Sequence, residues 1–416
     1  MLKLDCHGYS STILHRILHM AGVVNSFDVA AVALSVVGEI VISDRQINKL
    51  TTEVGQQLQR DRDERTSRYV DQDLPRRATE VLPAPDLAAV FCDGGRMRTR
   101  DEGQGPGVHH PHWREPKNAG FHRMQSSQFA QDPQPDLPEC FRNQTYVEKL
   151  VKGLKGHKKE GREEVLEEMC SAVEDTGPLP ERCDWQPKTL FRTCLSSLAS
   201  SDDFGPMMAA EADARGFFAA KKKAFLGDGL PYNWTIQQRW FPQFEPIVDF
   251  LHAVEYLYTC AKAVHAAPDT YWQQYVDWAT ACWQGRTDQL LAELGAWQAR
   301  VGPVPEGEDL PDSDPRQAIH TTRTYFANNQ SRMAYARYRR DGLPVTSSLA
   351  ESLVKQIHQR VKGTEKFWND GASGEAILQI RAAVISEDDR LATWLWTRPI
   401  SPFSPRCRSA PLAAGL

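Results

Sequence analysis

Short apolar runs that end in an acidic residue are the most regular pattern in this sequence. One run covers residues 87–92 (LAAVFC) and is followed by Asp93, and another covers residues 224–226 (AFL) and is followed by Gly227 and Asp228. A short continuous apolar run is typical of a strand that is buried on both faces of a sheet. The pattern therefore predicts two central strands, each with an aspartate at its carboxyl end.

The rest of the middle of the chain alternates between strand and helix patterns. The predicted elements are strands at residues 96–100, 113–121 and 246–250, and helices at about residues 142–173, 186–221 and 251–264. Strands and helices interleaved in this way predict a mixed α/β domain rather than a helical bundle.

Residues 12–60 carry a helical pattern with two starts. Ser26 is placed to cap a helix that ends near Gly38, and Ser43 is placed to cap a second helix with Ile47 and Leu50 on one face. Two short helices joined in this way fit a helix-turn-helix that contacts DNA, and they fit a structural helical hairpin equally well. The charged residues 61–80 are predicted to be an exposed linker or a helix end.

The second half of the chain is mainly helical in pattern. Residues 268–300 carry four tryptophans at helical spacings, and an acidic, Pro-rich loop at residues 303–315 separates them from a basic segment at residues 316–366. That segment holds ten Lys or Arg residues against three acids, a surplus of seven positive charges. It is therefore the segment best suited to contact phosphates. The tryptophans are expected to be core residues, with stacking on an extruded base as the alternative.

Composition narrows the class of protein. A net charge of −5 over 416 residues excludes a generic polycation that coats nucleic acid, and no apolar run reaches the roughly 18 residues that a membrane span requires. The nine cysteines include no C-x-x-C pair, so they indicate buried free thiols in a reducing compartment rather than a zinc ribbon or a disulfide framework. The expected location is the cytoplasm.

The two strand-terminal aspartates suggest metal chemistry. Mg²⁺ and Mn²⁺ prefer carboxylate oxygens, and enzymes that cut phosphodiesters gather carboxylates from separate elements around two ions about 4 Å apart. Asp93 and Asp228 suit this role, although aspartates at strand ends also form turns. Glu351 is the third candidate, and it shares one helical face with Lys355 and His358. Its alternative role is a capping box with Ser348, because Ser-x-x-Glu is the spacing of that motif.

Two further groups of polar residues stand out. Asp249 and His252 occupy a strand-to-helix junction, where the alternative to a catalytic role is a hydrogen-bonded pair that holds the junction together. His109, His110 and His112 lie close together in a loop without a carboxylate or cysteine at ligand spacing. We do not expect a metal site there.

Taken together, these pieces resemble a known family. The segments VFCDGG, WREPK, AFLGDGLPYNW and PIVDFLHAVEYLY and the block at residues 325–368 occur in this order. They are similar to the DDE-type transposases of bacterial insertion sequences, in the branch that encodes one long transposase. The resemblance covers about residues 20–385 and is most specific at residues 224–258 and 325–368.

The resemblance implies an RNase-H-like mixed sheet flanked by helices. It places the catalytic, metal-binding triad on Asp93, Asp228 and Glu351, with Mg²⁺ or Mn²⁺ as two ions, and a secondary signature on Asp249 and His252. The implied domains are an N-terminal helical, DNA-binding region (1–80), the first part of the core (85–264, with a helical insert at about 126–185), a Trp-rich helical insertion (265–330), the Glu helix and end of the core (331–390) and a disordered tail (391–416).

The implied activity is DNA cleavage and strand transfer at the ends of an insertion sequence. The expected partners are double-stranded DNA and further copies of the chain, with no membrane. The location that the resemblance implies is the bacterial cytoplasm, near the nucleoid. The residues expected to bind DNA are Arg332, Arg337, Arg339, Arg340, Lys355, Arg360 and Lys362. Because the chain starts close to the predicted helix-turn-helix, a shortened, inactive copy that only binds DNA is one alternative, and a nuclease of the same fold is another.

Overall fold

The computed structural model describes residues 4–71 except 6, residues 84–100 and 112–156, and residues 185–398 except 309, 347, 363–367 and 369. The side chains of residues 155, 156 and 348–352 lie outside this description. The predicted loop histidines His109 and His110 also lie outside it.

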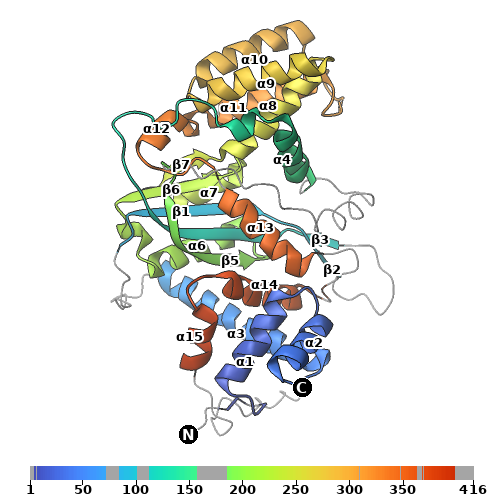
Figure 1. Ribbon diagram of the computed structural model, residues 1–416, viewed down its shortest axis with the longest axis vertical. Coiled ribbons are helices and arrows are strands. Elements are labelled where there is room, and N and C mark those ends of the chain that lie inside the picture. Colours follow the sequence, from blue (N-terminus) through green and yellow to red (C-terminus); the bar gives the residue numbers. More distant parts are fainter. Residues whose placement is uncertain are drawn as a thin grey trace.

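A five-stranded mixed sheet forms the middle of the molecule (Figure 1). In the order in which they lie side by side, the strands are β5 (Lys188–Ser197), β4 (Lys117–Gln125), β1 (Leu87–Gly94), β6 (Lys222–Gly227) and β7 (Glu245–Val248). β1 pairs antiparallel with β4 and parallel with β6. On the outer sides of these two strands, β4 pairs antiparallel with β5, and β6 pairs parallel with β7. The mixed α/β fold class is therefore confirmed, and both apolar runs that end before Asp93 and Asp228 are central strands.

Helices cover both faces of the sheet. On one face, Leu353 of α13 (Ser348–Val361) packs in the same cluster as Cys194 of β5 and Ile377 of α14 (Gly371–Ile385). On the other face, α6 (Ser201–Ala214) and the 3₁₀ helix η2 (Phe217–Ala219) pack in the cluster that contains Phe121 of β4. Because side chains alternate along a strand, each strand contributes to both layers of the core.

Two sequence predictions within this region are wrong. Residues 188–197 form strand β5 rather than part of a helix, because pairing along β4 satisfies their backbone groups in an extended conformation. The segment after Asp93 does not return into the central sheet. Instead β2 (Met97–Thr99) pairs with β3 (His112–Arg114) in a separate two-stranded ribbon, and β4 starts only after Pro116, which lacks a backbone N–H.

The N-terminal helices form a second layer below the sheet in Figure 1. They are α1 (Ser11–Val23), α2 (Phe27–Gly38) and α3 (Asp44–Val70). The predicted caps are confirmed, since Ser26 accepts a hydrogen bond from the N–H of Val29 and Ser43 from that of Gln46. α3 continues to Val70, so residues 61–70 are the helix end that was one of the two predictions for residues 61–80, and residues 72–80 lie outside the described part of the chain.

These helices pack on the C-terminal end of the chain. Buried residues of α1, α2 and α3 share one hydrophobic cluster with α14 and α15 (Arg390–Thr397). Leu391 and Leu395 of α15 are buried in it. Residues 391–397, which the sequence assigns to a disordered tail, therefore belong to the folded structure.

A helical bundle lies at the other end of the molecule (Figure 1). It consists of α4 (Gln144–Gly156), α8 (Phe250–Val264), α9 (Pro268–Trp283), α10 (Thr287–Val301) and α11 (Pro315–Asn329). Trp278 and Trp283 are almost fully buried in it, as expected for core tryptophans. Among the described residues, no helix combines the length and apolar character needed to cross a membrane.

Candidate active site

The two predicted aspartates come from neighbouring parallel strands in register. Cys92 of β1 is paired with Gly227 of β6, so the next residues, Asp93 and Asp228, lie side by side at the carboxyl edge of the sheet. Parallel strands are about 4.8 Å apart, which places the two carboxylates within reach of a shared ion. Burial raises the pKa of the Cys92 thiol, and the negative charges of both aspartates raise it further. The structure therefore brings Asp93 and Asp228 together.

Strand alternation places both aspartates on the face that α13 covers. Phe91 packs edge-on against His122 at 4.8 Å between ring centroids, and an added Cβ at Gly120 would lie 3.4 Å from Leu353 of α13. Asp93 follows Phe91 by two residues, so it shares this face. Asp228 lies on this face too, because it follows Leu226 by two residues and Leu226 is paired with Phe91.

Helix α13, which carries Glu351, is anchored at both ends of this edge. Before the helix, the carbonyl of Val345 accepts a hydrogen bond of 3.0 Å from the N–H of Phe250, one residue beyond Asp249. Near its other end, Nε2 of His358 accepts a hydrogen bond of 3.1 Å from the N–H of Arg96, just after β1. Residue 351 lies between the two anchors. The side chains of Ser348 and Glu351 lie outside the description, so the metal-ligand and capping interpretations of Glu351 both stand.

The Asp228 carboxylate is held in a fixed orientation. Its Oδ1 accepts hydrogen bonds from the N–H of Leu230 at 2.9 Å and from Nδ2 of Asn233 at 2.7 Å. Its carbonyl accepts a hydrogen bond of 2.9 Å from the hydroxyl of Tyr325. Within the described part of the chain, no donor reaches Oδ2. The turn role expected of a strand-end aspartate is therefore fulfilled by one oxygen, and the other is available as a ligand.

Asp249 and His252 lie beside this pair, and each also has a hydrogen-bond or ion-pair partner on α8. Asp249 caps α8, and its Oδ1 accepts a hydrogen bond of 3.0 Å from the N–H of Leu251. His252 Nδ1 lies 3.6 Å from Oε2 of Glu255. Burial lowers the pKa of His252, but the bond to Glu255 and the surrounding carboxylates outweigh it and raise the pKa to about 10. His252 is therefore an imidazolium that places a positive charge among these acids.

Two of the seven basic residues predicted to bind DNA are structural. Arg339 is fully buried, donates through Nε to Asp132 at 2.8 Å and stacks on Trp283. Arg360 is 2% exposed and donates through Nε to the carbonyl of Ala21 at 2.6 Å. Neither guanidinium can contact DNA in this conformation, because each is used to join distant parts of the fold.

The other five basic candidates keep more access to solvent. Lys355 is exposed and Lys362 is half-buried, both on or just after α13. Arg337 pairs with Glu245 at 2.5 Å, Arg340 pairs with Asp341 at 3.3 Å, and Arg332 lies over the ring of Trp234. These side chains stay candidates for phosphate contacts.

Three polar side chains that the sequence pattern does not single out lie at the same edge. Glu115 and Lys117 belong to the WREPK segment, and Tyr232 belongs to the start of α7 (Pro231–Trp240). Burial raises the pKa of the Tyr232 hydroxyl, and the negative charges of Asp228 and Asp93 add to that effect. The only sequence signal for these residues is their place inside the motifs of the family resemblance.

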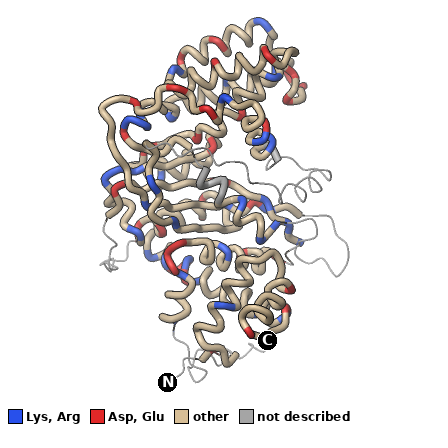
Figure 2. Tube along the Cα trace, in the orientation of Figure 1, with Lys and Arg blue, Asp and Glu red and all other residues tan. Residues whose placement is uncertain are grey.

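Charges of both signs are spread along the chain, as Figure 2 shows. The short β2–β3 ribbon after Asp93 is a basic exception, because partly exposed arginines lie on it or beside it, namely Arg96, Arg98, Arg100 and Arg114. The sequence predicts phosphate contacts for the basic segment at residues 316–366 and not for this ribbon. The ribbon adds positive charge directly next to the carboxylates.

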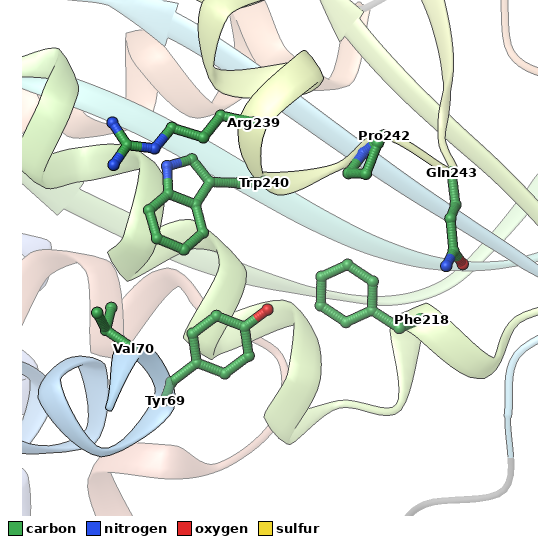
Figure 3. A pocket seen from close by; sticks show the side chains of 7 residues that line it. All are labelled: Tyr69, Val70, Phe218, Arg239, Trp240, Pro242 and Gln243. Carbon is green, nitrogen blue, oxygen red and sulfur yellow. The ribbon is translucent and has the colours of Figure 1, made fainter. Parts of the chain in front are cut away.

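The structure also contains a cavity of about 340 Å³ (Figure 3). Its lining includes Tyr69, Phe218, Arg239 and Trp240. α7 starts beside Asp228 and ends at Trp240, so its ten residues separate the two places by roughly 15 Å. The cavity is therefore not part of the carboxylate site.

Comparison of the chain with protein-family models and with curated proteins found no match.

Proposed function

We propose that this chain is a metal-dependent transposase that cleaves and joins DNA strands at the ends of an insertion sequence. The observation that carries the proposal is the placement of Asp93 and Asp228, in register on parallel strands and facing the helix that bears Glu351. Three carboxylates on these elements match the triad that the family resemblance implies.

We also propose that the central domain is RNase-H-like. The first three strands of the central sheet in chain order, β1, β4 and β5, form an antiparallel meander. The last two, β6 and β7, are added parallel to β1 on its other side. This arrangement supports the expected mixed sheet with its first two acids on the adjacent central strands. The bundle of α9 and α10 stands where the resemblance expects a helical insertion before the Glu helix.

The donor set fits Mg²⁺ or Mn²⁺. The described side chains contribute two adjacent carboxylates and contain no group of three metal-binding residues, and the third expected ligand, Glu351, lies outside them. Carboxylate oxygens are the ligands that these ions prefer. When bound, two such ions would activate the attacking oxygen and stabilise the leaving oxygen of a phosphodiester.

The protein's own residues prepare the site for this chemistry. Asn233 and the N–H of Leu230 fix the orientation of the Asp228 carboxylate, so this side chain would reorganise little when it binds a metal ion. The positive charge of His252 offsets the repulsion among the neighbouring carboxylates. The hydrogen bonds of Val345 and His358 fix the chain on either side of residue 351, which supports Glu351 as the third ligand.

The test uses the purified full chain and a plasmid that carries the coding region with its natural flanking DNA. With Mn²⁺ or Mg²⁺, we expect cuts at both flanks and joining of the freed 3′ ends to other DNA. Asp93→Asn, Asp228→Asn and Glu351→Gln should each lower the cleavage rate by about 10²-fold or more. The matched control is Asp86→Asn, at the opposite end of β1, which should cleave like the wild type.

The products separate the proposal from its alternatives. Cleavage without joined products would favour a nuclease, and binding without cleavage would favour an inactive copy. If Asp93→Asn cleaves as fast as the wild type, the proposed triad is wrong. We further propose that the active form is a homo-oligomer that pairs two DNA ends, which sedimentation of the protein–DNA complex would test.

A further inference from the structure

Lys117 is the one lysine among the described residues that is buried, at 9% exposure. It is the first residue of β4 and is paired with Gly94, the last residue of β1. Lysines are almost never buried without a partner, because the ammonium loses its hydration. Its place at the edge that holds Asp93 therefore calls for a specific reason.

The ion-pair partner of Lys117 is a weakly held anion. The ammonium lies 3.4 Å from Oε2 of Glu115, and the Glu115 side chain is 53% exposed whereas that of Lys117 is 11% exposed. A half-exposed carboxylate can move into water at small cost. Another anion could then take its place beside the ammonium.

The aromatic ring of Tyr232 lies beside Lys117, and this residue carries a second donor. The ammonium is 5.7 Å from the centroid of the Tyr232 ring. The Tyr232 hydroxyl is buried and has no hydrogen-bond partner in the described part of the chain. A buried donor without an acceptor costs about 1–3 kcal/mol, so an incoming anionic oxygen would be favoured by both groups.

The position of Lys117 indicates which anion binds. Strand alternation puts Asp93 and Asp228 on the α13 face of the sheet, and puts Lys117 with Cys92 on the other face. Both faces meet at the carboxyl edge. A DNA strand that crosses this edge would place the cleaved phosphodiester on the aspartates and an adjacent phosphate near Lys117.

From these observations we propose that Lys117 and Tyr232 bind a DNA phosphate next to the cleaved one. In the absence of DNA, the Glu115 carboxylate pairs with the Lys117 ammonium in place of that phosphate. This inference rests on the proposed function, since it takes DNA as the ligand. It assigns to Glu115 a competing role, so removing its charge should strengthen DNA binding.

The experiment measures the affinity of the full chain for a 30-base-pair duplex centred on the cleavage position mapped in the plasmid assay. Fluorescence anisotropy in EDTA gives a readout that does not depend on catalysis. We expect Lys117→Met to weaken binding about tenfold, Tyr232→Phe about threefold, and Glu115→Gln to tighten binding about threefold.

The matched controls come from an ion pair of the same type at the opposite edge. Lys221 lies 3.1 Å from Asp86, and its side chain is 82% exposed. Lys221→Met and Asp86→Asn change the net charge by the same amounts but should alter affinity less than twofold. They separate a local contact from a general effect of net charge, and Tyr69→Phe serves in the same way for Tyr232.

A scan with methylphosphonates, which remove the charge of single phosphates, identifies the contact. In the wild type, one phosphate within two nucleotides of the cleavage position should show a penalty of about tenfold, and Lys117→Met should abolish that penalty alone. If wild-type protein cleaves DNA but Lys117→Met keeps every penalty, or Glu115→Gln weakens binding, this inference is wrong and the proposed function is unaffected. If the wild type cleaves neither flank, both are wrong.

Discussion

The contact between Gly95 and His358 should control both the stability of the protein and the position of the Glu351 helix. Gly95 lies in the turn after β1, and an added Cβ there would lie 2.6 Å from Nε2 of His358 and 3.1 Å from Nδ2 of Asn118. Gly95 has no positive φ, so an alanine can adopt the same backbone conformation. The effect of Gly95→Ala on stability therefore comes from steric overlap of the new Cβ with its neighbours and not from backbone strain.

The size of the effect follows from these contacts. Since ordinary contacts of a Cβ begin near 3.4 Å, the His358 ring must move by about 0.8 Å. Such overpacking costs roughly 1–3 kcal/mol. The movement also breaks the hydrogen bond from the Arg96 N–H to Nε2, which adds about 1 kcal/mol. We expect Gly95→Ala to lower the free energy of unfolding by about 2–4 kcal/mol.

Urea unfolding followed by far-ultraviolet circular dichroism measures this change. The control is Gly153→Ala in α4, where an added Cβ meets nothing within 4 Å, and it should stabilise the helix by about 0.5–1 kcal/mol. His358→Ala removes the obstacle, so adding Gly95→Ala to it should cost at least about 1 kcal/mol less than in the wild type. Equal costs in the two backgrounds would refute the proposed contact. Under the proposed function, Gly95→Ala should also slow cleavage about 10²-fold, because α13 is displaced.

Three further predictions concern buried ionisable groups. Because the pKa of His252 is raised to about 10, the contribution of its positive charge to stability is complete below pH 6.5 and is lost as the pH rises through 10. The free energy of unfolding should show this loss, about a few kcal/mol, in the wild type but not in His252→Gln. Burial lowers the pKa of His122 to about 3, so the unfolded chain binds a proton that the folded chain does not, and stability should fall between pH 6.5 and 3; His122→Leu should lack this acid-dependent loss. Arg339→Met should destabilise the fold by about 3–5 kcal/mol in urea unfolding, because it leaves Asp132 without its partner, whereas the exposed Arg340→Met should change stability by less than about 0.5 kcal/mol. Equal effects of the two arginine substitutions would contradict the structural role of Arg339.

Features set by neighbouring residues could be predicted from the sequence. Ser26 and Ser43 start their helices as expected, since a cap needs only a side-chain oxygen three residues before a backbone N–H. The apolar runs before Asp93 and Asp228 form strands because both faces of β1 and β6 are buried. The mixed α/β class follows from these local patterns.

Features set by distant partners could not be predicted. The segment at residues 188–197 has apolar positions that fit a helix, and only pairing with β4 makes it a strand. Likewise, a basic segment does not reveal that Arg339 and Arg360 point into the core, because their partners Asp132 and Ala21 are more than 200 residues away in sequence. Local patterns cannot register such contacts.

The carboxylate site divides in the same way. The sequence by itself determined the two strand-end aspartates, since an apolar run that stops at an acid is a local pattern. Only the tertiary structure decided that these strands are adjacent, parallel and in register, and that α13 packs on the face of the sheet to which both aspartates belong. It also placed Lys117, Glu115 and Tyr232 at that edge, because the charge and burial of a side chain depend on every element packed around it.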